Sequence, residues 1–283
     1  MTHSHDHHSG SQPDWAVRGP DLIADGEVNA PMVNQALTWL TGRLPTAKLV
    51  LDVGSGPGVA AVRLAELLPE AEVLAVDGAP ELLELAAERA ARLGVADRFD
   101  TRAVTLPSGL AELPAADLIW VGGVVHHLPD PAAAVRDLAG RLRPGGILAL
   151  REGGLSLRFL PSYADRGLSA RVDAISAELS SHGIHPMGAL EVPRAWPDLL
   201  RDAGLAPVSK TFLLDLPAPL DEQTRSRLRR HLRLTREVTA ELLAADDLAL
   251  LDRLIDDDDP ESVLHRPDVF LLRASTIHTG ARG

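Results

Sequence analysis

Apolar positions follow two different spacings along most of this chain. Short runs that are apolar throughout, as in buried strands, are separated by segments whose apolar residues recur about every three to four positions, as in helices. Because such strands are apolar on both faces and alternate with helices, we expect a parallel sheet covered on both sides. The pattern predicts strands at 49–53, 72–76, 99–106, 118–121 and 147–150, and helices at 60–68, 80–93 and 130–142.

The segments on either side of this alternation are organised differently. An earlier helix is expected from residue 30 to Pro45, with Pro31 in its first turn. After Glu152 the alternation breaks, and residues 153–167 are expected to form a loop because they contain three glycines and a proline. Beyond it we expect helices at 169–181, 196–203 and 221–256, and strands at 207–216 and 269–275.

We interpret residues 14–283 as one domain, because no clear linker interrupts them. Its parts would be a core at about 45–152, a helical lid or cap at about 153–205, and C-terminal strands and helices at 206–283. Residues 1–13 are polar and contain four histidines. We expect them to form a disordered tail and no metal site, because nothing nearby would fix the geometry of the ligands.

Composition narrows the class of partner. The formal net charge is −12, and an acidic chain repels phosphate backbones, so we expect no nucleic-acid partner. Six arginines at 225–236 form a possible docking face, although flanking acidic residues favour a solvated helix face. The chain has no cysteine, which excludes thiolate metal sites and cysteine nucleophiles. Without an apolar leader or a membrane-length apolar run, we expect a cytoplasmic protein that does not associate with membranes.

A glycine-rich turn follows the first expected strand. It contains Asp52, Gly54, Gly56 and Gly58. Glycine lets the backbone turn tightly and approach a ligand, and the helix that follows offers free N–H groups at its start. A dinucleotide-binding turn would carry its third glycine one position later, where this chain has Val59. By itself, the turn is also compatible with an ordinary connection between a strand and a helix.

The Asp-x-Gly-x-Gly-x-Gly pattern at 52–58 resembles motif I of class I S-adenosylmethionine-dependent methyltransferases. Asp77 ends the second strand 25 residues after Asp52, where a carboxylate can accept hydrogen bonds from both hydroxyls of a ribose; a helix cap is the alternative. Three further segments look like later motifs of that family in the same order: 116–121, 126–130 and 142–146.

The resemblance covers about residues 45–152 and is silent on the methyl acceptor. It implies an α/β fold with a Rossmann-like, doubly wound, mostly parallel seven-stranded sheet and a helical lid insertion. It also implies S-adenosylmethionine as cofactor. The cofactor-binding residues expected from the resemblance are Asp52, Gly54, Ser55, Gly56, Gly58, Asp77, Gly78, Thr105, Leu106, Val121 and Gly122.

The resemblance gives these residues different roles. The three glycines of the turn would line the methionine end of the cofactor, Asp52 would organise the loop, and Asp77 would hold the ribose. Val121 and Gly122 would lie against the cofactor and face the acceptor. Many family members carry an acidic residue after the third strand for the adenine amino group. Residues 103–106 contain none, so either Thr105, Leu106 or backbone groups make this contact, or the alignment with the family shifts here by a residue or two.

Candidate catalytic residues lie at the ends of the fourth and fifth strands. His126 and His127 follow the fourth strand, where a base of near-neutral pKa would meet the acceptor, although such a pair also occurs in the family without a catalytic role. Glu152 would orient an amine or hydroxyl, and Arg151 would hold an anionic group; a surface ion pair is the alternative.

Methyl transfer to a small-molecule acceptor is the favoured function, because the chain has a cap-like segment and no obvious docking module. Two alternatives stay open: a protein that binds S-adenosylmethionine without transferring methyl, and a protein or RNA methyltransferase that docks through residues 225–236. A nicotinamide oxidoreductase is disfavoured by Val59. The acceptor, the atom methylated and the oligomeric state are not determined by the sequence.

Overall fold

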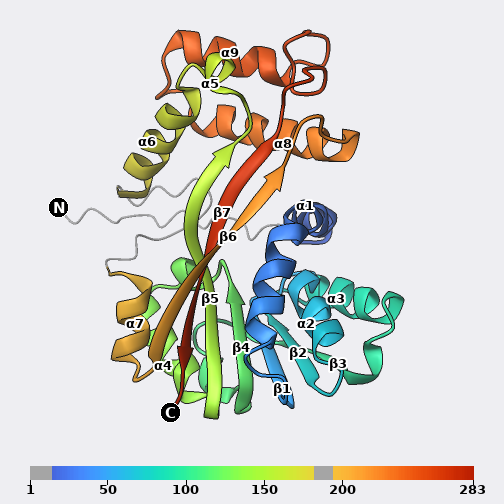
Figure 1. The fold of residues 1–283 in the computed structure, drawn as a ribbon, viewed down its shortest axis with the longest axis vertical. Helices are drawn as coiled ribbons and strands as arrows, with labels where there is room; N and C mark the ends of the chain where they lie inside the picture. The colour runs from blue at the N-terminus through green and yellow to red at the C-terminus, as the bar shows by residue number, and fades with distance from the viewer. Residues whose placement is uncertain (1–14, 182–193) are drawn as a thin grey trace, which may run out of the picture.

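The computed structural model describes residues 15–181 and 194–283. Their strands form one seven-stranded sheet in the order β3-β2-β1-β4-β5-β7-β6 (Figure 1). The first five strands pair in parallel, and β7 lies antiparallel between β5 and β6. The mostly parallel, seven-stranded sheet expected from the sequence is therefore confirmed. The strands are β1 (Leu49–Val53), β2 (Glu72–Asp77), β3 (Phe99–Ala103), β4 (Ala116–Gly122), β5 (Leu142–Arg158), β6 (Ala206–Leu216) and β7 (Leu271–Ala281).

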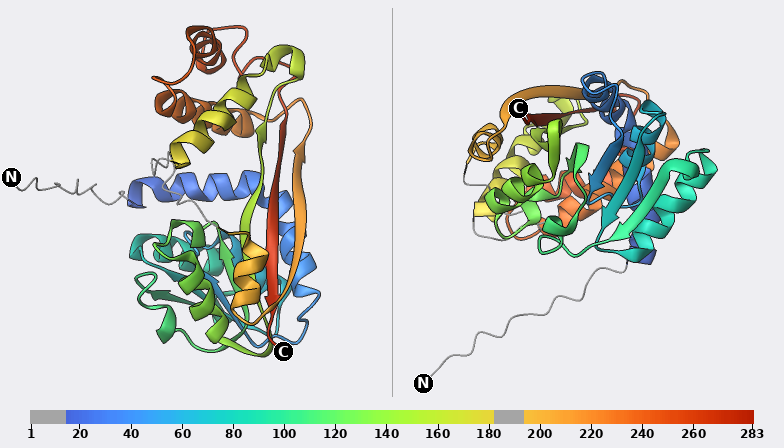
Figure 2. Two further views of the ribbon diagram at one scale, coloured as in Figure 1. Left: turned by 90° about the vertical axis from the view of Figure 1, so that its left-hand side faces the viewer. Right: turned by 90° about the horizontal axis from the view of Figure 1, so that it is seen from below.

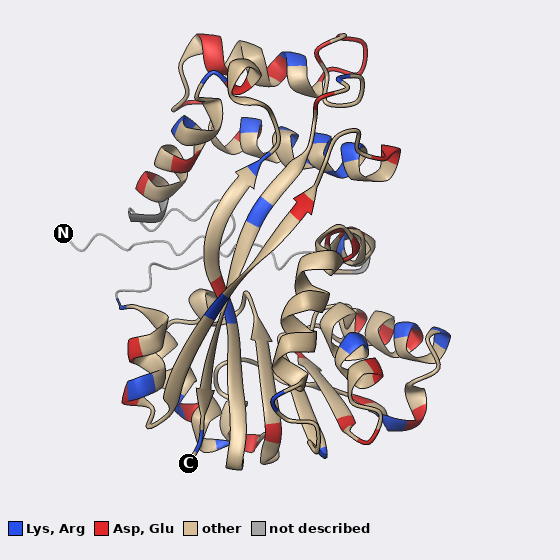
Figure 3. Cartoon of the chain, viewed as in Figure 1, with Lys and Arg blue, Asp and Glu red and all other residues tan. Residues whose placement is uncertain are grey.

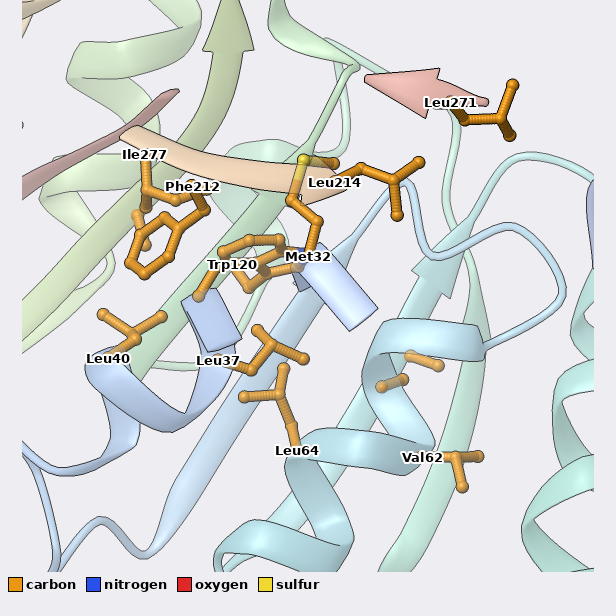
Figure 4. Close-up of a cluster of buried hydrophobic side chains, with 14 of the residues drawn as sticks. Met32, Leu37, Leu40, Val62, Leu64, Trp120, Phe212, Leu214, Leu271 and Ile277 are labelled. Carbon is orange, nitrogen blue, oxygen red and sulfur yellow. The ribbon is translucent and has the colours of Figure 1, made fainter. Parts of the chain in front are cut away.

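Helices cover both faces of the sheet and bury two apolar clusters. On one face the cluster joins the sheet to α1 (Trp15–Thr41), α2 (Val59–Leu67) and α3 (Pro80–Arg92). Figure 4 shows part of it, with Trp120 of β4 among side chains from α1, β6 and β7. On the other face the cluster joins the sheet to α4 (Pro131–Gly140) and α7 (Trp196–Asp202). The carboxylate of Asp130 caps α4 by accepting a 2.8 Å hydrogen bond from the backbone N–H of Ala133.

The first helix begins earlier than the sequence predicts. The expected start at residue 30 is wrong, because α1 begins at Trp15 and includes both Pro20 and Pro31. A proline inside a helix removes one hydrogen bond and crowds the preceding turn, which accounts for the bend of α1 seen in Figure 2. Gly26 lets the first half of α1 approach α2 closely, since a Cβ there would lie 2.9 Å from a methyl group of Val59.

Three strands continue beyond the body of the sheet. β5, β7 and β6 rise past the carboxyl ends of β1 and β4 to a second group of helices, here called the cap helices (Figures 1 and 2). Two insertions supply the cap helices, one after β5 and one between β6 and β7. They are α5 (Ser162–Asp165), α6 (Leu168–Ser181), α8 (Glu222–Val238) and α9 (Ala245–Ile255).

Three expected boundaries are corrected by this arrangement. Residues 153–158 are not loop, because β5 continues to Arg158 and pairs there with Leu272 of β7. The helix at 196–202, expected within the lid, instead packs against the sheet beside α4. The third strand ends at Ala103 and not at residue 106, because a turn closed by hydrogen bonds from Ser108 and Gly109 to the carbonyl of Thr105 follows it. The His-rich tail lies outside the described residues.

The arginines at 225–236 lie on α8 and are engaged within the molecule, next to acidic elements (Figure 3). Arg227 binds Asp21 and Asp25 of α1 at 2.8 and 2.7 Å, and Arg230 also binds Asp21. Arg225 donates to the backbone carbonyls of residues 220, 263 and 266. The other three arginines of the run pair with Asp252 or Asp257. This helix therefore joins the cap helices to α1. No described helix is both long and apolar enough to cross a bilayer.

Candidate active site

The glycine-rich turn connects β1 to α2 at the carboxyl edge of the sheet. Gly54, Gly56 and Gly58 all have positive φ, at 72°, 52° and 74°, which glycine adopts without strain. The backbone N–H groups of Gly54 and Ser55 both donate to the carbonyl of Val76 on β2, at 2.7 and 3.0 Å. These two hydrogen bonds hold the turn against the neighbouring strand.

Each glycine of the turn meets a different environment. A Cβ on Gly54 would lie 2.3 Å from Val124, and one on Gly58 would lie 2.6 Å from Ala86 of α3. A Cβ on Gly56 would have no atom within 4 Å. The outer glycines therefore permit close packing of the protein on itself, while the turn is open above the middle one.

This contrast gives a matched pair of substitutions. Gly56→Ala is expected to destabilise the fold by about 1–2 kcal/mol, the cost of a left-handed conformation in a residue with a Cβ. Gly54→Ala is expected to cost about 1–3 kcal/mol more, because its Cβ also collides with Val124. Urea unfolding of both variants measures the difference, and equal losses of stability would show that the close contact at Val124 is absent.

Asp77 ends β2 beside the turn. Its Oδ2 accepts a 2.8 Å hydrogen bond from the N–H of Gly56, and its Oδ1 accepts one of 3.0 Å from Ala79. The carboxylate therefore holds the middle of the turn, a role not foreseen from the sequence. Each carboxylate oxygen can accept a second bond, so both can still receive a hydroxyl. Gly78 follows it, close to the carbonyl of Val104.

Asp52 lies in β1 and is almost completely buried, with 2% of its surface exposed. Burial, reinforced by the neighbouring carboxylate of Asp77, raises its pKa to about 7. Its Oδ2 has no hydrogen-bond partner among the described residues. A buried carboxyl oxygen without a hydrogen-bond partner lowers the stability of the folded state. The presence of Asp52 is therefore better explained by a function than by stability.

The raised pKa of Asp52 predicts a pH-dependent stability. The folded-state pKa of about 7 exceeds the ordinary value of 3.8, so the folded protein binds more protons in that window and stability falls as pH rises through it. Asp52→Asn is expected to remove this loss, making the variant more stable than the wild type at pH 8 by roughly 4 kcal/mol at most. Urea unfolding at pH 5 and pH 8 measures it, with the exposed Asp137→Asn as control. The same pH dependence in wild type and Asp52→Asn would contradict the assignment.

Glu152 and His126 meet at the same edge of the sheet. Glu152 follows Arg151 on β5 and is 4% exposed, while His126 lies in the short helix η3 (Val125–His127) after β4. The His126 Nδ1 is 2.6 Å from Glu152 Oε2. Glu152 Oε1 has no hydrogen-bond partner among residues 15–181 and 194–283. His278 of β7 fixes the backbone here, because its Nε2–H donates to the carbonyl of Glu152 at 3.2 Å.

The two neighbouring histidines are therefore not equivalent. His127 is exposed, and its ring lies 4.0 Å from that of His126. The ring of His126 is oriented by the buried carboxylate of Glu152. A neutral imidazole that donates through Nδ1 presents Nε2 as its basic atom. Of the three candidate catalytic residues, the structure brings His126 and Glu152 into one unit.

The remaining candidates lie at the ends of β3 and β4. Thr105 is exposed and Leu106 half-buried in the turn after β3. Val121 points its side chain into the apolar cluster on the α4 face, so only its backbone can face a ligand. Gly122 lies beside Trp120 and Arg151, whose Nε1 and Nε would be 3.1 and 3.4 Å from a Cβ placed on it.

Comparison with known proteins shows that part of this chain is similar to methyltransferases. Residues 51–148 match a family described as a methyltransferase domain. A trans-aconitate 2-methyltransferase of Methylobacterium radiotolerans is 37% identical over 114 residues, which cover 40% of this chain and 41% of that protein. A ribosomal protein L11 methyltransferase of Symbiobacterium thermophilum is 34% identical over 158 residues, covering 55% and 44%. This chain thus spans less than half the length of either relative.

A solved structure shares the fold. An O-methyltransferase family protein from Burkholderia thailandensis superimposes with a TM-score of 0.51 and 23% identity, over 69% of this chain and 56% of that one. This likeness shows that the chain shares the α/β fold of that protein, here built on a mostly parallel seven-stranded sheet. Residues 51–148, which match the methyltransferase-domain family, contain most of β1, the strands β2 to β4 and the glycine turn of this fold.

Proposed function

We propose that this protein transfers a methyl group from S-adenosylmethionine to a small-molecule acceptor. The observation that carries the proposal is the meeting of the glycine turn, Asp77 and the His126–Glu152 pair at one edge of the sheet. Ligands of open α/β sheets bind at this edge. The cap helices lie beyond it (Figure 2).

The residues of the turn fit the cofactor. The turn is open above Gly56, both oxygens of Asp77 retain the capacity to accept a ribose hydroxyl, and Asp52 holds an unpartnered oxygen close by. We assign Asp77 to the ribose and the glycine turn to the methionine end. When bound, S-adenosylmethionine supplies a methyl group already activated by a sulfonium. The protein then has mainly to align the acceptor and remove a proton from it.

His126 is suited to the removal of that proton. Its Nδ1–H donates to the buried carboxylate of Glu152, which fixes the ring and leaves Nε2 to accept a proton from the acceptor. As the ring becomes positively charged, the adjacent carboxylate stabilises it. Glu152 acts in this scheme as a positioning residue, because it touches His126 and not the acceptor.

The surroundings of this edge favour a small-molecule acceptor. The basic face of α8, the candidate docking surface for RNA or protein, is engaged by carboxylates and carbonyls of the molecule itself. The relatives differ in acceptor, since one is named for trans-aconitate and the other for a ribosomal protein. The names of these relatives therefore do not point to one class of acceptor.

Calorimetric titration with S-adenosylmethionine, S-adenosylhomocysteine and NAD tests the cofactor. We expect micromolar binding of the first two and no binding of NAD. A screen of small acceptors for release of S-adenosylhomocysteine then tests transfer. Binding without release, for small molecules, RNA and protein alike, would favour a protein that binds S-adenosylmethionine without transferring methyl. Binding of NAD alone would overturn the proposal.

A further inference from the structure

Arg151 lies on β5 at the carboxyl edge of the sheet, where we place the methyl acceptor. It pairs in register with Gly122 of β4 and Ile277 of β7. Its Nη2 would be 3.6 Å from a Cβ placed on Gly123, and the Cε1 of His126 would be 3.9 Å from the same point. The guanidinium and the imidazole therefore flank the same end of β4, with no side chain of Gly122 or Gly123 between them.

Arg151 has no ion-pair partner within the part of the chain that the structure describes, and the same holds for Arg273 of β7. The Nε of Arg273 is buried without a hydrogen-bond partner, and its Nη1 is 3.5 Å from the side-chain oxygen of Asn29 on α1. Arg227, by contrast, binds two carboxylates. Half-buried guanidinium groups without a bound carboxylate are unfavourable for folding and suited to receiving a ligand.

A third basic side chain, His231 of α8, lies in electrostatic range of Arg273. Burial lowers the pKa of Arg151, Arg273 and His231 of α8, and the charge of Arg273 lowers that of the other two further. His231 is nevertheless exposed to solvent. Arg151 and Arg273 lie on the neighbouring strands β5 and β7, and their positive charges act on one another beside the carboxylates of Glu152 and Asp52.

We propose that Arg151 binds a carboxylate of the methyl acceptor, with Arg273 supporting it, so that this protein methylates small carboxylic acids beside His126. This inference rests on the proposed function. A planar carboxylate matches the guanidinium fork with two parallel hydrogen bonds. The carboxylates of Glu152 and Asp52, which also act on Arg151, favour a singly charged group over a phosphate dianion. The recognised feature is the carboxylate itself, so simple carboxylates bind the site.

The test is calorimetry in the presence of saturating S-adenosylhomocysteine, with benzoate, malonate and citrate as probes. Benzamide serves as the neutral counterpart and inorganic phosphate as the dianion. We expect at least one carboxylate to bind with a Kd of about 1–10 mM, the strength of two charge-assisted hydrogen bonds. Benzamide and phosphate are expected to bind at least tenfold more weakly. Binding of phosphate alone, or of none of the carboxylates, overturns the inference.

Substitutions of the two arginines test whether they bind the carboxylate. Arg151→Gln is expected to weaken carboxylate binding tenfold or more, and Arg151→Lys by less, because lysine keeps the charge but loses the fork. Arg273→Gln is expected to weaken it to a smaller extent, and Arg92→Gln, exposed on α3, not at all. Melting temperatures establish that each variant is folded. Unchanged carboxylate affinity in folded Arg151→Gln overturns the inference.

The same variants separate this inference from the proposed function. If the wild type does not bind S-adenosylmethionine, the proposed function fails. If it binds the cofactor but no carboxylate, only the present inference fails. If Arg151→Gln weakens the binding of S-adenosylhomocysteine and leaves that of carboxylates unchanged, Arg151 serves the cofactor and the inference is wrong.

Discussion

Replacement of His126 by alanine is expected to lower the turnover number by about 10²–10⁴, the usual contribution of a general base, while the affinity for S-adenosylmethionine stays within about twofold of wild type. The reason is geometric. The Nδ1 of His126 is held at 2.6 Å by Glu152 of β5, whereas we assign the cofactor to Asp77 and the glycine turn. Removing the ring therefore removes the base and not the cofactor site.

The measurement is the rate of S-adenosylhomocysteine release with an acceptor found in the screen, together with calorimetry of cofactor binding. His127→Ala is the comparison, because that side chain is adjacent but exposed. Glu152→Gln should give an intermediate loss, since glutamine still orients the ring but does not stabilise its positive charge. If His127→Ala costs more activity than His126→Ala, the assignment of the base is wrong.

Asp77→Ala is expected to weaken binding of S-adenosylmethionine by about 1.5–3 kcal/mol, or roughly 10- to 150-fold, as for lost hydrogen bonds to a charged group. Two effects act in the same direction. The ribose loses its acceptor, and the N–H of Gly56 loses the 2.8 Å bond that holds the middle of the turn.

Calorimetric titration of wild type and variant measures this loss of affinity. The affinity of Asp77→Asn for S-adenosylmethionine should lie between those of the wild type and Asp77→Ala. The one carbonyl oxygen of asparagine can still accept a hydrogen bond from Gly56 or from a hydroxyl. Asp137→Ala removes an exposed carboxylate from α4 and serves as the matched control. An affinity for S-adenosylmethionine that is the same in Asp77→Ala and wild type would remove Asp77 from the cofactor site.

The fold of the sheet was predictable because local patterns determine it. Continuous apolar runs located its strands, and the glycines with Asp77 located the edge that carries the site. The first half of α1 was not predictable, because Pro20 and Pro31 oppose a continuous helix locally. Tertiary contacts override that preference, among them the ion pairs of Arg227 with Asp21 and Asp25.

The candidate site shows the same limit. Sequence alone could not separate His126 from His127, because a short helix after β4 decides which ring meets Glu152. Arg273 and His231 were missed entirely. They lie more than 75 residues from Arg151 in the sequence and carry no motif. The pairing of β7 with β5 brings Arg273 towards Arg151, and the packing of α8 brings His231 towards Arg273.

The path of β5 has a consequence for how this protein could diversify. The glycine turn, Asp77 and His126 are encoded before residue 148, where the match to the family ends. Arg151 and both cap insertions are encoded after it, and the insertions join only at the ends of strands. Replacement of these insertions would leave in place the residues that we assign to the methyl donor. We therefore expect the acceptor specificity of this fold to change through its C-terminal half while the residues that we assign to the methyl donor stay the same.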